Sequence, residues 1–218
     1  TTVPGYKGPK TRETQVARGL AADAAGNLYV TEGPARLIRK VTPDGTVTTL
    51  AGGGAGEDLD GRGSAASFSY PIGLAVDPSG HVYVADRDAN RIRKIAPDGT
   101  VTTLAGNGEE GSQNGQGREA SFNGPDRLAV DKAGNVCVAD FAGHFLRLIA
   151  PDGTVRAIAG TGEASRGGTA QAAYFAEPKA LGGDRAHNLY VLSAEQLFRV
   201  SPSGESAVYG GADADGEP

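Results

Sequence analysis

One feature constrains the fold of this chain more than any other: a unit of about 54 residues recurs four times. The motif Gly19–Asp23 (GLAAD) returns as Gly73–Asp77 (GLAVD), Arg127–Asp131 (RLAVD) and Ala180–Asp184 (ALGGD), so its leucine recurs at intervals of 54, 54 and 53 residues. Self-similarity at a fixed period of this length indicates a solenoid, a propeller or another repeat array.

Each unit contains four short strand signals separated by turns. In the second unit these are Leu74–Val76, Val82–Ala85, Arg91–Ile95 and Thr100–Leu104. The strands are rich in β-branched and aromatic residues, and Pro-x-Gly turns join the first to the second and the third to the fourth. No window shows an apolar period of 3.6 residues, so we expect almost no helix.

A four-stranded antiparallel unit of this size cannot bury both of its faces alone, and radial stacking of such units gives a β-propeller. We therefore predict an all-β propeller with four four-stranded blades, its leucine strands innermost and its Thr-Val-Thr-Thr strands outermost. An open β-solenoid is the alternative. The chain reads as one propeller region, 1–218, with approximate repeats 19–72, 73–126, 127–179 and 180–218, and with 1–18 as an extra outer strand and linker.

The residues of the second unit resemble the NHL repeat family of β-propellers. The segments that carry the resemblance are Pro71–Asp77 (PIGLAVD), Gly80–Asp86 (GHVYVAD) and Asn90–Ile95 (NRIRKI). The insertion Asp60–Phe68 before them is similar to the longer variety of many bacterial members. The family includes protein binders, RNA binders, extracellular sensor domains and a few lyases, so the resemblance implies a fold rather than one activity.

The two ends of the chain leave the size of the ring open. Thr1–Gly5 aligns with an outermost strand, yet the fourth unit has its own outermost strand, Ser206–Tyr209. The tail Ala212–Gly216 resembles the start of a further repeat, and Ser193 replaces the aspartate that ends the second strand elsewhere. The four blades therefore form part of a larger or oligomer-completed ring, a closed four-bladed ring, or an open arc.

Composition argues against several partners. The net charge is −5, and the basic residues are spread singly, so we expect no nucleic-acid binding. No apolar run approaches the roughly 18 residues that cross a bilayer, so we expect no membrane insertion. The single cysteine, Cys137, gives no intrachain disulfide. The start at Thr1 and the lack of Met favour either an exported, processed protein or a piece of a longer one, and the first of these predicts an extracellular or periplasmic location.

The long loops between units are the expected binding elements. They cover Glu57–Phe68, Glu109–Phe122 and Glu163–Phe175, and they share one face with the loops between second and third strands. Long loops on a rigid scaffold commonly carry binding residues. The candidate ligand-binding residues on this face are Asp58, Asp60, Arg62, Arg87, Asp88, Asn90, Phe141 and His144.

Asp58 and Asp60 have the D-x-D-G spacing of carboxylates that can bind Ca²⁺ together, and Asp213 and Asp215 repeat it. A full twelve-residue EF-hand pattern is missing, so these residues are read first as solvated turn residues. We predict no cofactor, with Ca²⁺ as the lesser alternative.

No catalytic set converges in the sequence. His81 and His187 fall in first hairpins, whereas His144 falls across the blade, so the three cannot share one zinc ion. Cys137 occupies a middle position of the second strand, where a small buried side chain is expected. We therefore predict no metal site and no catalytic residue.

The aspartates that repeat from unit to unit have a structural interpretation. Asp77 follows the inner strand, whereas Asp86 and Asp140 end the second strand. Because these aspartates recur in several blades, we expect each to have the same structural role: to accept hydrogen bonds from N–H groups of a turn, or to bind a basic side chain such as Arg91.

These observations favour a non-catalytic scaffold that presents its long loops to a protein or a glycan. A metal-dependent propeller lyase or hydrolase is one alternative, and a self-assembling blade array is another. A homo-oligomer that completes the ring is compatible with the first and the last of these functions.

Overall fold

The computed structural model describes residues 17–56, 58–160, 178–184, 188–193, 196–201 and 206–211. In this part of the chain every regular element is a β-strand or a one-turn 3₁₀ helix, and no helix is long and apolar enough to span a membrane. The strands form four separate antiparallel sheets, arranged as the blades of a propeller. The all-β propeller prediction is confirmed.

Each blade follows chain order from its inner to its outer strand. Blade 1 contains β1 (Ala17–Ala22), β2 (Leu28–Glu32), β3 (Leu37–Val41) and β4 (Val47–Gly52). Blade 2 contains β6 (Pro71–Val76), β7 (Val82–Asp86), β8 (Arg91–Ile95) and β9 (Thr100–Ala105). Blade 3 contains β11 (Pro125–Val130), β12 (Val136–Asp140), β13 (Phe145–Ile149) and β14 (Thr154–Ala159). Blade 4 contains β15 (Pro178–Gly183), β16 (Leu189–Ser193), β17 (Gln196–Val200) and β18 (Ser206–Gly211).

Two of the sheets gain a fifth strand from the loop that precedes them. The two-residue strands β5 (Gly61–Arg62) and β10 (Gly115–Gln116) pair with the outermost strands β9 and β14, respectively. The 3₁₀ turns η1 (Gly63–Ala65) and η3 (Gly117–Glu119) follow them. Each of these two long loops is therefore tied to the outermost strand of the blade that it leads into.

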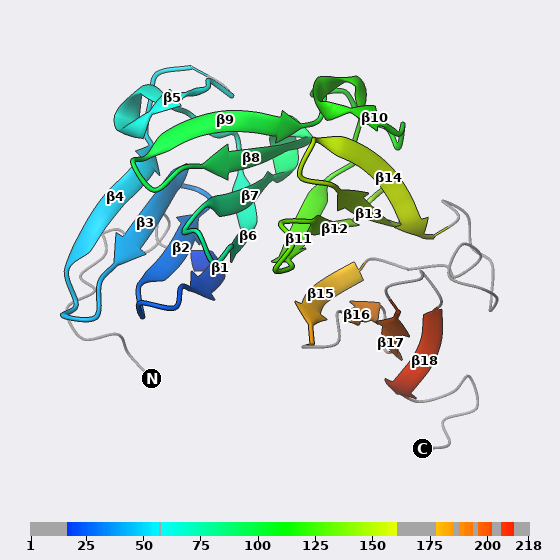
Figure 1. The fold of residues 1–218 in the computed structure, drawn as a ribbon. Helices are drawn as coiled ribbons and strands as arrows, with labels where there is room; N and C mark the ends of the chain where they lie inside the picture. The colour runs from blue at the N-terminus through cyan, green and yellow to red at the C-terminus, as the bar shows by residue number, and fades with distance from the viewer. Residues whose placement is uncertain are drawn as a thin grey trace.

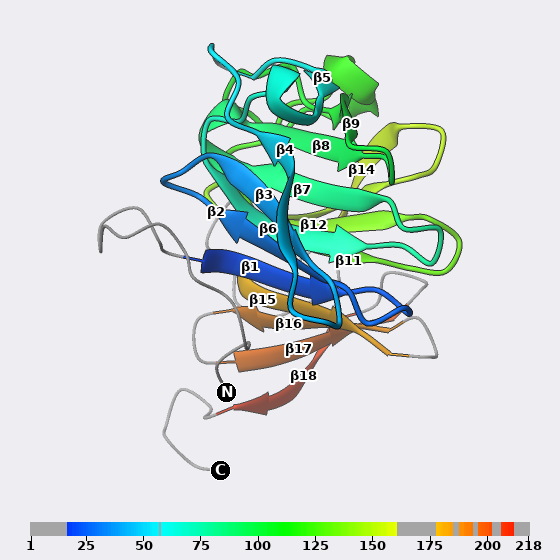
Figure 2. The ribbon, with the colours of Figure 1, turned by 90° about the vertical axis from the view of Figure 1, so that its left-hand side faces the viewer.

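The blades form an arc whose inner side is lined by β1, β6, β11 and β15 (Figure 1). The first and last blades lie at the two ends of this arc, as the side view also shows (Figure 2). Inner strands approach closely at two glycines. A Cβ atom at Gly19 or Gly73 would overlap the backbone carbonyl oxygen of Ile72 or Asp126 in the next inner strand. The glycine that opens the repeated motif therefore allows adjacent blades to meet at the axis in these two places.

The core lies between blades rather than within them. Blade 2 contributes Leu74, Val84 and Val101 to the cluster shared with blade 1, and it contributes Tyr83 and Ile92 to the cluster shared with blade 3. Alternating side chains of one sheet thus enter two different cores, as the period-2 geometry of a strand requires. The prediction that a single blade cannot bury both faces alone agrees with this packing.

The first hairpin of every blade is held by its aspartate. Asp77 accepts hydrogen bonds from the backbone N–H groups of Ser79 and His81, each at 2.9 Å, and from the hydroxyl of Tyr83 at 3.1 Å. Asp23, Asp131 and Asp184 make the same pattern of backbone contacts to the residue four positions on. The predicted structural duty of these aspartates is therefore visible as an Asx-type turn.

Several sequence predictions fall outside the described residues. The outer strand expected at 1–5, the third long loop at 163–175 and the tail at 212–216 belong to this group, as does His187.

Candidate functional site

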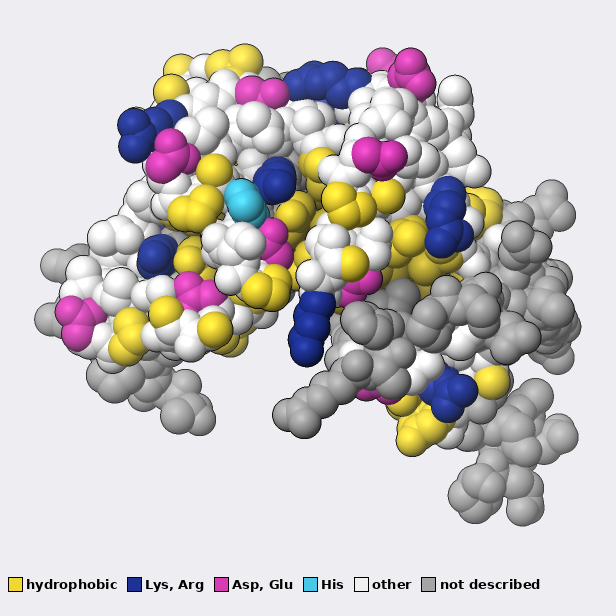
Figure 3. Space-filling view, viewed as in Figure 1, with side chains coloured by type: hydrophobic (Ala, Val, Ile, Leu, Met, Phe, Trp, Pro, Cys, Tyr) yellow, Lys and Arg dark blue, Asp and Glu magenta, His cyan; other side chains and the backbone are white. Residues whose placement is uncertain are grey.

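The loops between second and third strands lie on the same face as the long loops between blades. The backbone N–H of Arg87 donates to the carbonyl of Tyr70 at 3.1 Å, and the N–H of Phe141 donates to the carbonyl of Gly124 at 3.3 Å. These bonds join each second-to-third-strand turn to the end of the long loop beside it. We name this side the long-loop face. The opposite face, seen in Figure 3, carries the short hairpins, and charged and apolar side chains are interspersed over it.

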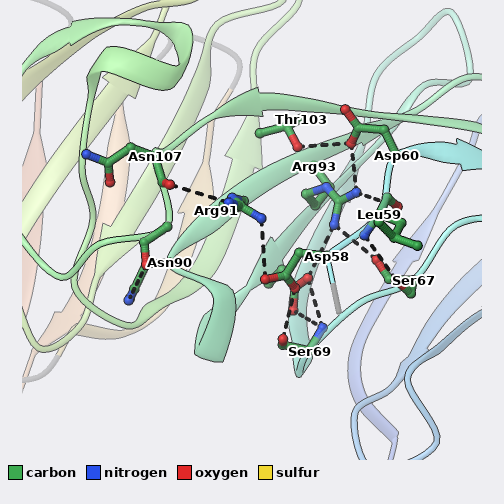
Figure 4. Close-up of polar contacts among 12 residues, drawn as sticks. Asp58, Leu59, Asp60, Ser67, Ser69, Asn90, Arg91, Arg93, Thr103 and Asn107 are labelled. Atoms are coloured by element: carbon green, nitrogen blue, oxygen red, sulfur yellow. Dashed lines mark hydrogen bonds and ion pairs between the residues drawn. The ribbon is translucent and has the colours of Figure 1, made fainter. Parts of the chain in front are cut away.

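A buried arginine fastens each described long loop to its blade. In blade 2 the guanidinium of Arg93 donates to the carbonyls of Ser67 and Leu59, at 3.1 and 2.9 Å, and to Oδ1 of Asp60 at 2.8 Å (Figure 4). Its Nη1 lies 3.5 Å from Oδ2 of Asp86, and both of these side chains are fully buried. The guanidinium therefore neutralises a buried carboxylate and satisfies loop carbonyls at the same time.

The same arrangement recurs 54 residues later. Arg147 donates to the carbonyls of Ser121 and Gln113 and lies 3.4 Å from Asp140, again with both charged side chains fully buried. Blade 1 carries a related pair, in which Arg39 lies 3.1 Å from Glu32. We call these the arginine clasps.

One sequence interpretation needs correction here. The basic partner of Asp86 is Arg93 rather than Arg91, which instead lies 3.3 Å from Asp58. The two arginines are two residues apart and share one face of β8, but Arg93 lies beneath the long loop and Arg91 lies at the start of the strand beside it. The deeper position places the guanidinium against the strand-end carboxylate.

Burial is the main influence on the pKa values of Asp86 and Asp140, the two aspartates that pair with the buried clasp arginines. It raises the pKa of Asp86 to about 6, although the N–H groups of Tyr70 and Ser69 stabilise the carboxylate. It raises the pKa of Asp140 to about 7, against the opposing effects of the Asn123 N–H and of Arg147. Desolvation also lowers the pKa of Arg147, because its charged form is likewise penalised.

These shifts predict a pH-dependent stability. A carboxyl whose pKa is higher in the folded chain than the unfolded value of about 3.9 binds more protons when folded, so stability falls as pH rises from about 4 to 7. We expect this slope to become shallower in Asp140→Asn, because the amide does not titrate. Thermal melts of both proteins across this range measure it, and the histidines are common to both. An identical slope in the variant would contradict the assignment.

Two predicted ligand-binding carboxylates belong to these structural contacts (Figure 4). Asp58 accepts a hydrogen bond from Oγ of Ser69 at 2.9 Å and pairs with Arg91. Asp60 lies 2.8 Å from both Arg93 and Arg118. Both carboxylates are thus directed at arginines of the chain itself, which leaves the D-x-D-G spacing with a structural explanation.

The other predicted residues are distributed over several places. Arg62 lies on β5 and donates to the carbonyl of Asp98, beside the outer hairpin and away from the inner end of the long-loop face. Asn90 is buried in a left-handed conformation, φ 50°, and its Oδ1 accepts the N–H of Gly124 at 2.9 Å. His144 takes the equivalent left-handed position in blade 3, at φ 58°. Asp88 is exposed in the turn η2 (Arg87–Ala89).

Two predicted residues do meet across a blade boundary. The guanidinium of Arg87, in blade 2, lies over the ring of Phe141, in blade 3, with Cζ 5.2 Å from the ring centroid. Both side chains are half-buried. They occupy the same repeat position, directly after the strand-end aspartate, where blade 1 has Gly33. The structure therefore brings together two residues at a repeat position that differs in character from blade to blade.

A second pair of the same kind was not predicted. The guanidinium of Arg18 donates to Oη of Tyr70 at 2.9 Å and lies 5.8 Å from the centroid of its ring. Gly33 makes room for this pair, because a Cβ there would lie 3.2 Å from the Tyr70 ring and 3.3 Å from Arg18. The sequence did contain a signal for this pair. Tyr70 occupies the repeat position at which blade 3 has Gly124, so a large residue in one blade corresponds to glycine in the next.

The two pairs are neighbours on the long-loop face, and we call them together the aromatic–arginine rim. Its four residues are Arg18, Tyr70, Arg87 and Phe141. The backbone contact between Tyr70 and Arg87 links the pairs, so the rim crosses blades 1, 2 and 3 on the long-loop face. The rim residues are exposed or half-buried, in contrast to the clasp arginines Arg93 and Arg147, which are fully buried.

Other chemistry is sparse in the described part of the chain. It contains no group of three or more His, Cys, Asp or Glu side chains that could hold a metal ion. Nδ1 of His81 lies 3.1 Å from Asp77 in the first hairpin of blade 2. Cys137 is buried, and burial raises the pKa of its thiol to about 12, so it is a poor nucleophile at neutral pH.

Comparison with known proteins agrees with this architecture. The sequence profile of the NHL repeat matches residues 68–95, which span the inner strand and both middle strands of blade 2. The 54-residue period carries the same pattern through the other blades. Residues 68–95 therefore match the NHL repeat, and the described part of the chain has the fold of a β-propeller.

The similar proteins differ in function. The chain is 36% identical over 78 residues to the chloroplastic protein SUPPRESSOR OF QUENCHING 1 of Arabidopsis thaliana, a match to 7% of that protein. A structure of the nidogen/laminin complex superposes on 91% of the chain with a TM-score of 0.67 and 20% identity, and a streptogramin B lyase on 94% with a TM-score of 0.65 and 15% identity. The chain spans 66% and 58% of these two solved chains. At such identities the likeness shows the fold alone.

Proposed function

We propose that this chain is a non-catalytic scaffold that binds a protein partner through the aromatic–arginine rim. One observation carries the proposal: two arginine–aromatic pairs, Arg18 with Tyr70 and Arg87 with Phe141, each cross a blade boundary on the long-loop face, and a backbone hydrogen bond from Arg87 to Tyr70 links them. Tyr, Phe and Arg are the residue types enriched at the centres of protein interfaces.

The environment of Arg87 supports this assignment. Its backbone is fixed by the bond to Tyr70, and its guanidinium is held over Phe141. A guanidinium that lies over an aromatic ring can still donate its N–H groups to a carboxylate in a bidentate manner. The partner that fits best therefore offers an acceptor group to Arg87 and an apolar surface to the rings of Tyr70 and Phe141.

The rigidity of the rim also favours binding. Aromatic rings lose little conformational freedom when they are covered, and the rim is already ordered by contacts between blades. The arginine clasps fasten the long loops beneath it, so a partner would meet a surface that needs little rearrangement. The repeated residues thus build the scaffold, whereas the residues that vary from blade to blade form the contact surface.

Replacing the rim tests the proposal. We expect Arg87→Ala and Phe141→Ala each to weaken the affinity for a captured partner by about 2 kcal/mol or more, which is about thirty-fold in Kd. Arg156→Ala is the matched control, since Arg156 is an exposed arginine on the outermost strand of blade 3. The measurement is affinity capture from an extract of the source organism. Unchanged melting temperatures of all three variants would show that the substitutions leave the fold intact.

The outcome distinguishes the alternative ligands. Proteins retained by the wild type and the control but lost by both rim variants support the proposal. Equal retention by all variants would place the binding surface elsewhere. Binding of the wild type to an immobilised glycan panel, with no captured protein, would replace the protein partner with a glycan.

A metal-dependent lyase is the catalytic alternative, and its motivation is the shared fold with the streptogramin B lyase. Elemental analysis of protein purified without chelators tests it. A stoichiometric bound metal would favour this function over the scaffold.

A further inference from the structure

The boundary between blades 2 and 3 holds an arginine where the boundary between blades 1 and 2 holds a tyrosine. At the earlier boundary Tyr70 faces Gly33. At the later boundary Arg87 faces Gly124, which is the repeat equivalent of Tyr70. A Cβ atom at Gly124 would lie 3.8 Å from Nε of Arg87, so this glycine borders the guanidinium without covering it. The boundary lies inside the arc, between two blades whose four strands are all described.

The guanidinium of Arg87 lies within ion-pair distance of no carboxylate in the part of the chain that the structure describes. Other arginines of the same blade are paired. Arg91 lies 3.3 Å from Asp58 (Figure 4). Arg93 lies 2.8 Å from Asp60. A half-buried cation that its own chain does not neutralise is suited to binding an anionic group of a partner.

Blade 3 carries aromatic residues on this face at positions where blade 2 carries charges. Phe141 and Phe145 are both half-buried, and Phe145 occupies the repeat position of Arg91. The residue that pairs with Arg91, Asp58, is likewise replaced in blade 3 by the uncharged Ser112. The long-loop face therefore offers a cation on blade 2 and an aromatic surface on blade 3.

We infer that the partner presents an acidic segment of polypeptide to this boundary. A carboxylate side chain of the segment binds Arg87, and an apolar side chain close to it in the segment packs on Phe141. The inference rests on the proposed binding function of the aromatic–arginine rim and specifies the chemistry of the partner.

Local charge complementarity carries this assignment. A guanidinium and a carboxylate form paired, charge-assisted hydrogen bonds, which fix the orientation of the bound group as well as its charge. The net charge of the chain is −5, so the chain as a whole does not attract acidic molecules. Binding of an acidic segment therefore depends on Arg87 itself, which makes the inference testable by a single substitution.

Selection from a phage-displayed library of short random peptides tests the inference. We expect the wild type to enrich peptides in which Asp or Glu stands close to Leu, Ile, Phe or Tyr. Arg87→Glu is expected to lose these peptides and to enrich peptides with Lys or Arg instead, because the charge of the site is reversed. Arg156→Glu is the matched control, since it makes the same change at an exposed residue of β14.

Arg87→Gln guards against misfolding, because it removes the charge without adding another beside the buried Asp86. It is expected to lose the preference for acidic peptides without gaining one for basic peptides. Melting temperatures equal to that of the wild type would show that the variants are folded.

A selected peptide, synthesised with an amidated C-terminus so that only side chains supply carboxylates, gives the quantitative test. Replacing its Asp or Glu with the corresponding amide is expected to weaken binding to the wild type by about ten-fold or more. The same replacement should leave binding to Arg87→Gln unchanged, because the interaction is already absent there. Fluorescence anisotropy at a fixed salt concentration measures the four affinities.

The outcomes separate this inference from the proposed function. Selected peptides without acidic enrichment, whose binding is nevertheless lost in Arg87→Gln and Phe141→Ala, would overturn the acidic partner and keep the rim as the binding surface. Acidic peptides that bind both rim variants as well as the wild type would overturn the inference and the rim together. Failure of the wild type to select any peptide would overturn recognition of a short acidic segment, whereas a protein captured through the rim would still support the proposed function.

Discussion

Arg147→Ala is expected to destabilise the chain by about 3–5 kcal/mol at pH 8, because it leaves the fully buried carboxylate of Asp140 without its counter-charge. The same change also removes the donors to the carbonyls of Ser121 and Gln113, which fasten the second long loop. Urea unfolding of wild type and variant measures the difference. Arg156→Ala, on the exposed face of the same blade, is expected to change the stability by less than about 0.5 kcal/mol.

The pH dependence of this loss identifies its cause. Burial raises the pKa of Asp140 to about 7, so most of the carboxyl is protonated at pH 5 and needs no counter-charge there. We expect the destabilisation by Arg147→Ala to be smaller at pH 5 than at pH 8. An equal loss at both values would mean that packing and loop contacts, rather than the buried charge, account for the effect.

Blade 4 suggests a second variant that removes the pair altogether. At the positions of Asp140 and Arg147 it has Ser193 and Phe198, so both charges are replaced together in the natural sequence. We expect the double change Asp140→Ser with Arg147→Phe to cost less than the sum of the two single changes, since no buried charge is left unpaired. Additive losses would contradict the coupling of the two side chains.

Leu128→Ala should destabilise the chain by roughly 2–5 kcal/mol, and Leu74→Ala by a similar amount. Each leucine lies on an inner strand and packs against the preceding blade, so its truncation removes buried area and leaves a cavity between two blades. Thermal or urea unfolding gives the comparison. Leu59→Ala is the control, because that leucine is 46% exposed and lies in a loop. Unchanged stability of Leu128→Ala would undermine the placement of the leucine strands at the axis.

Much of the fold could be predicted because the same pattern of strands and turns occurs four times in the sequence. The leucine motif fixed the inner strand, and the Pro-x-Gly turns fixed the hairpins to within a residue or two. The Asx-type turn at Asp77 was likewise predictable, because its hydrogen bonds connect residues close in sequence. Local rules of this kind act within one hairpin and need no knowledge of neighbouring blades.

The arginine clasps were harder to predict, because they depend on contacts across the chain. Nothing in the segment RIRKI distinguishes Arg93, which is fully buried, from Arg91, which is not. The recurrence of Arg39, Arg93 and Arg147 at intervals of 54 residues was the available signal. The burial of Arg93 and Arg147 depends on the long loop that covers them, which the sequence pattern of a single strand does not show.

The candidate site was predicted in part. Arg87 and Phe141 were identified because they depart from the repeat, and the structure places them in contact. Arg18 and Tyr70 were missed, because Arg18 lies before the first repeated motif and its partner is 52 residues away. Asp58 and Asp60 were included for their spacing, which reflects their pairing with arginines of the chain.

A hydrogen-exchange footprint of the chain with its captured partner tests the central claim most directly. Backbone amides of the turns at Tyr70, Arg87 and Phe141 are expected to exchange more slowly in the complex, while those of the short hairpins on the opposite face are unchanged. Protection confined to the hairpin face, with none at these three turns, would contradict the assignment of the aromatic–arginine rim as the binding surface.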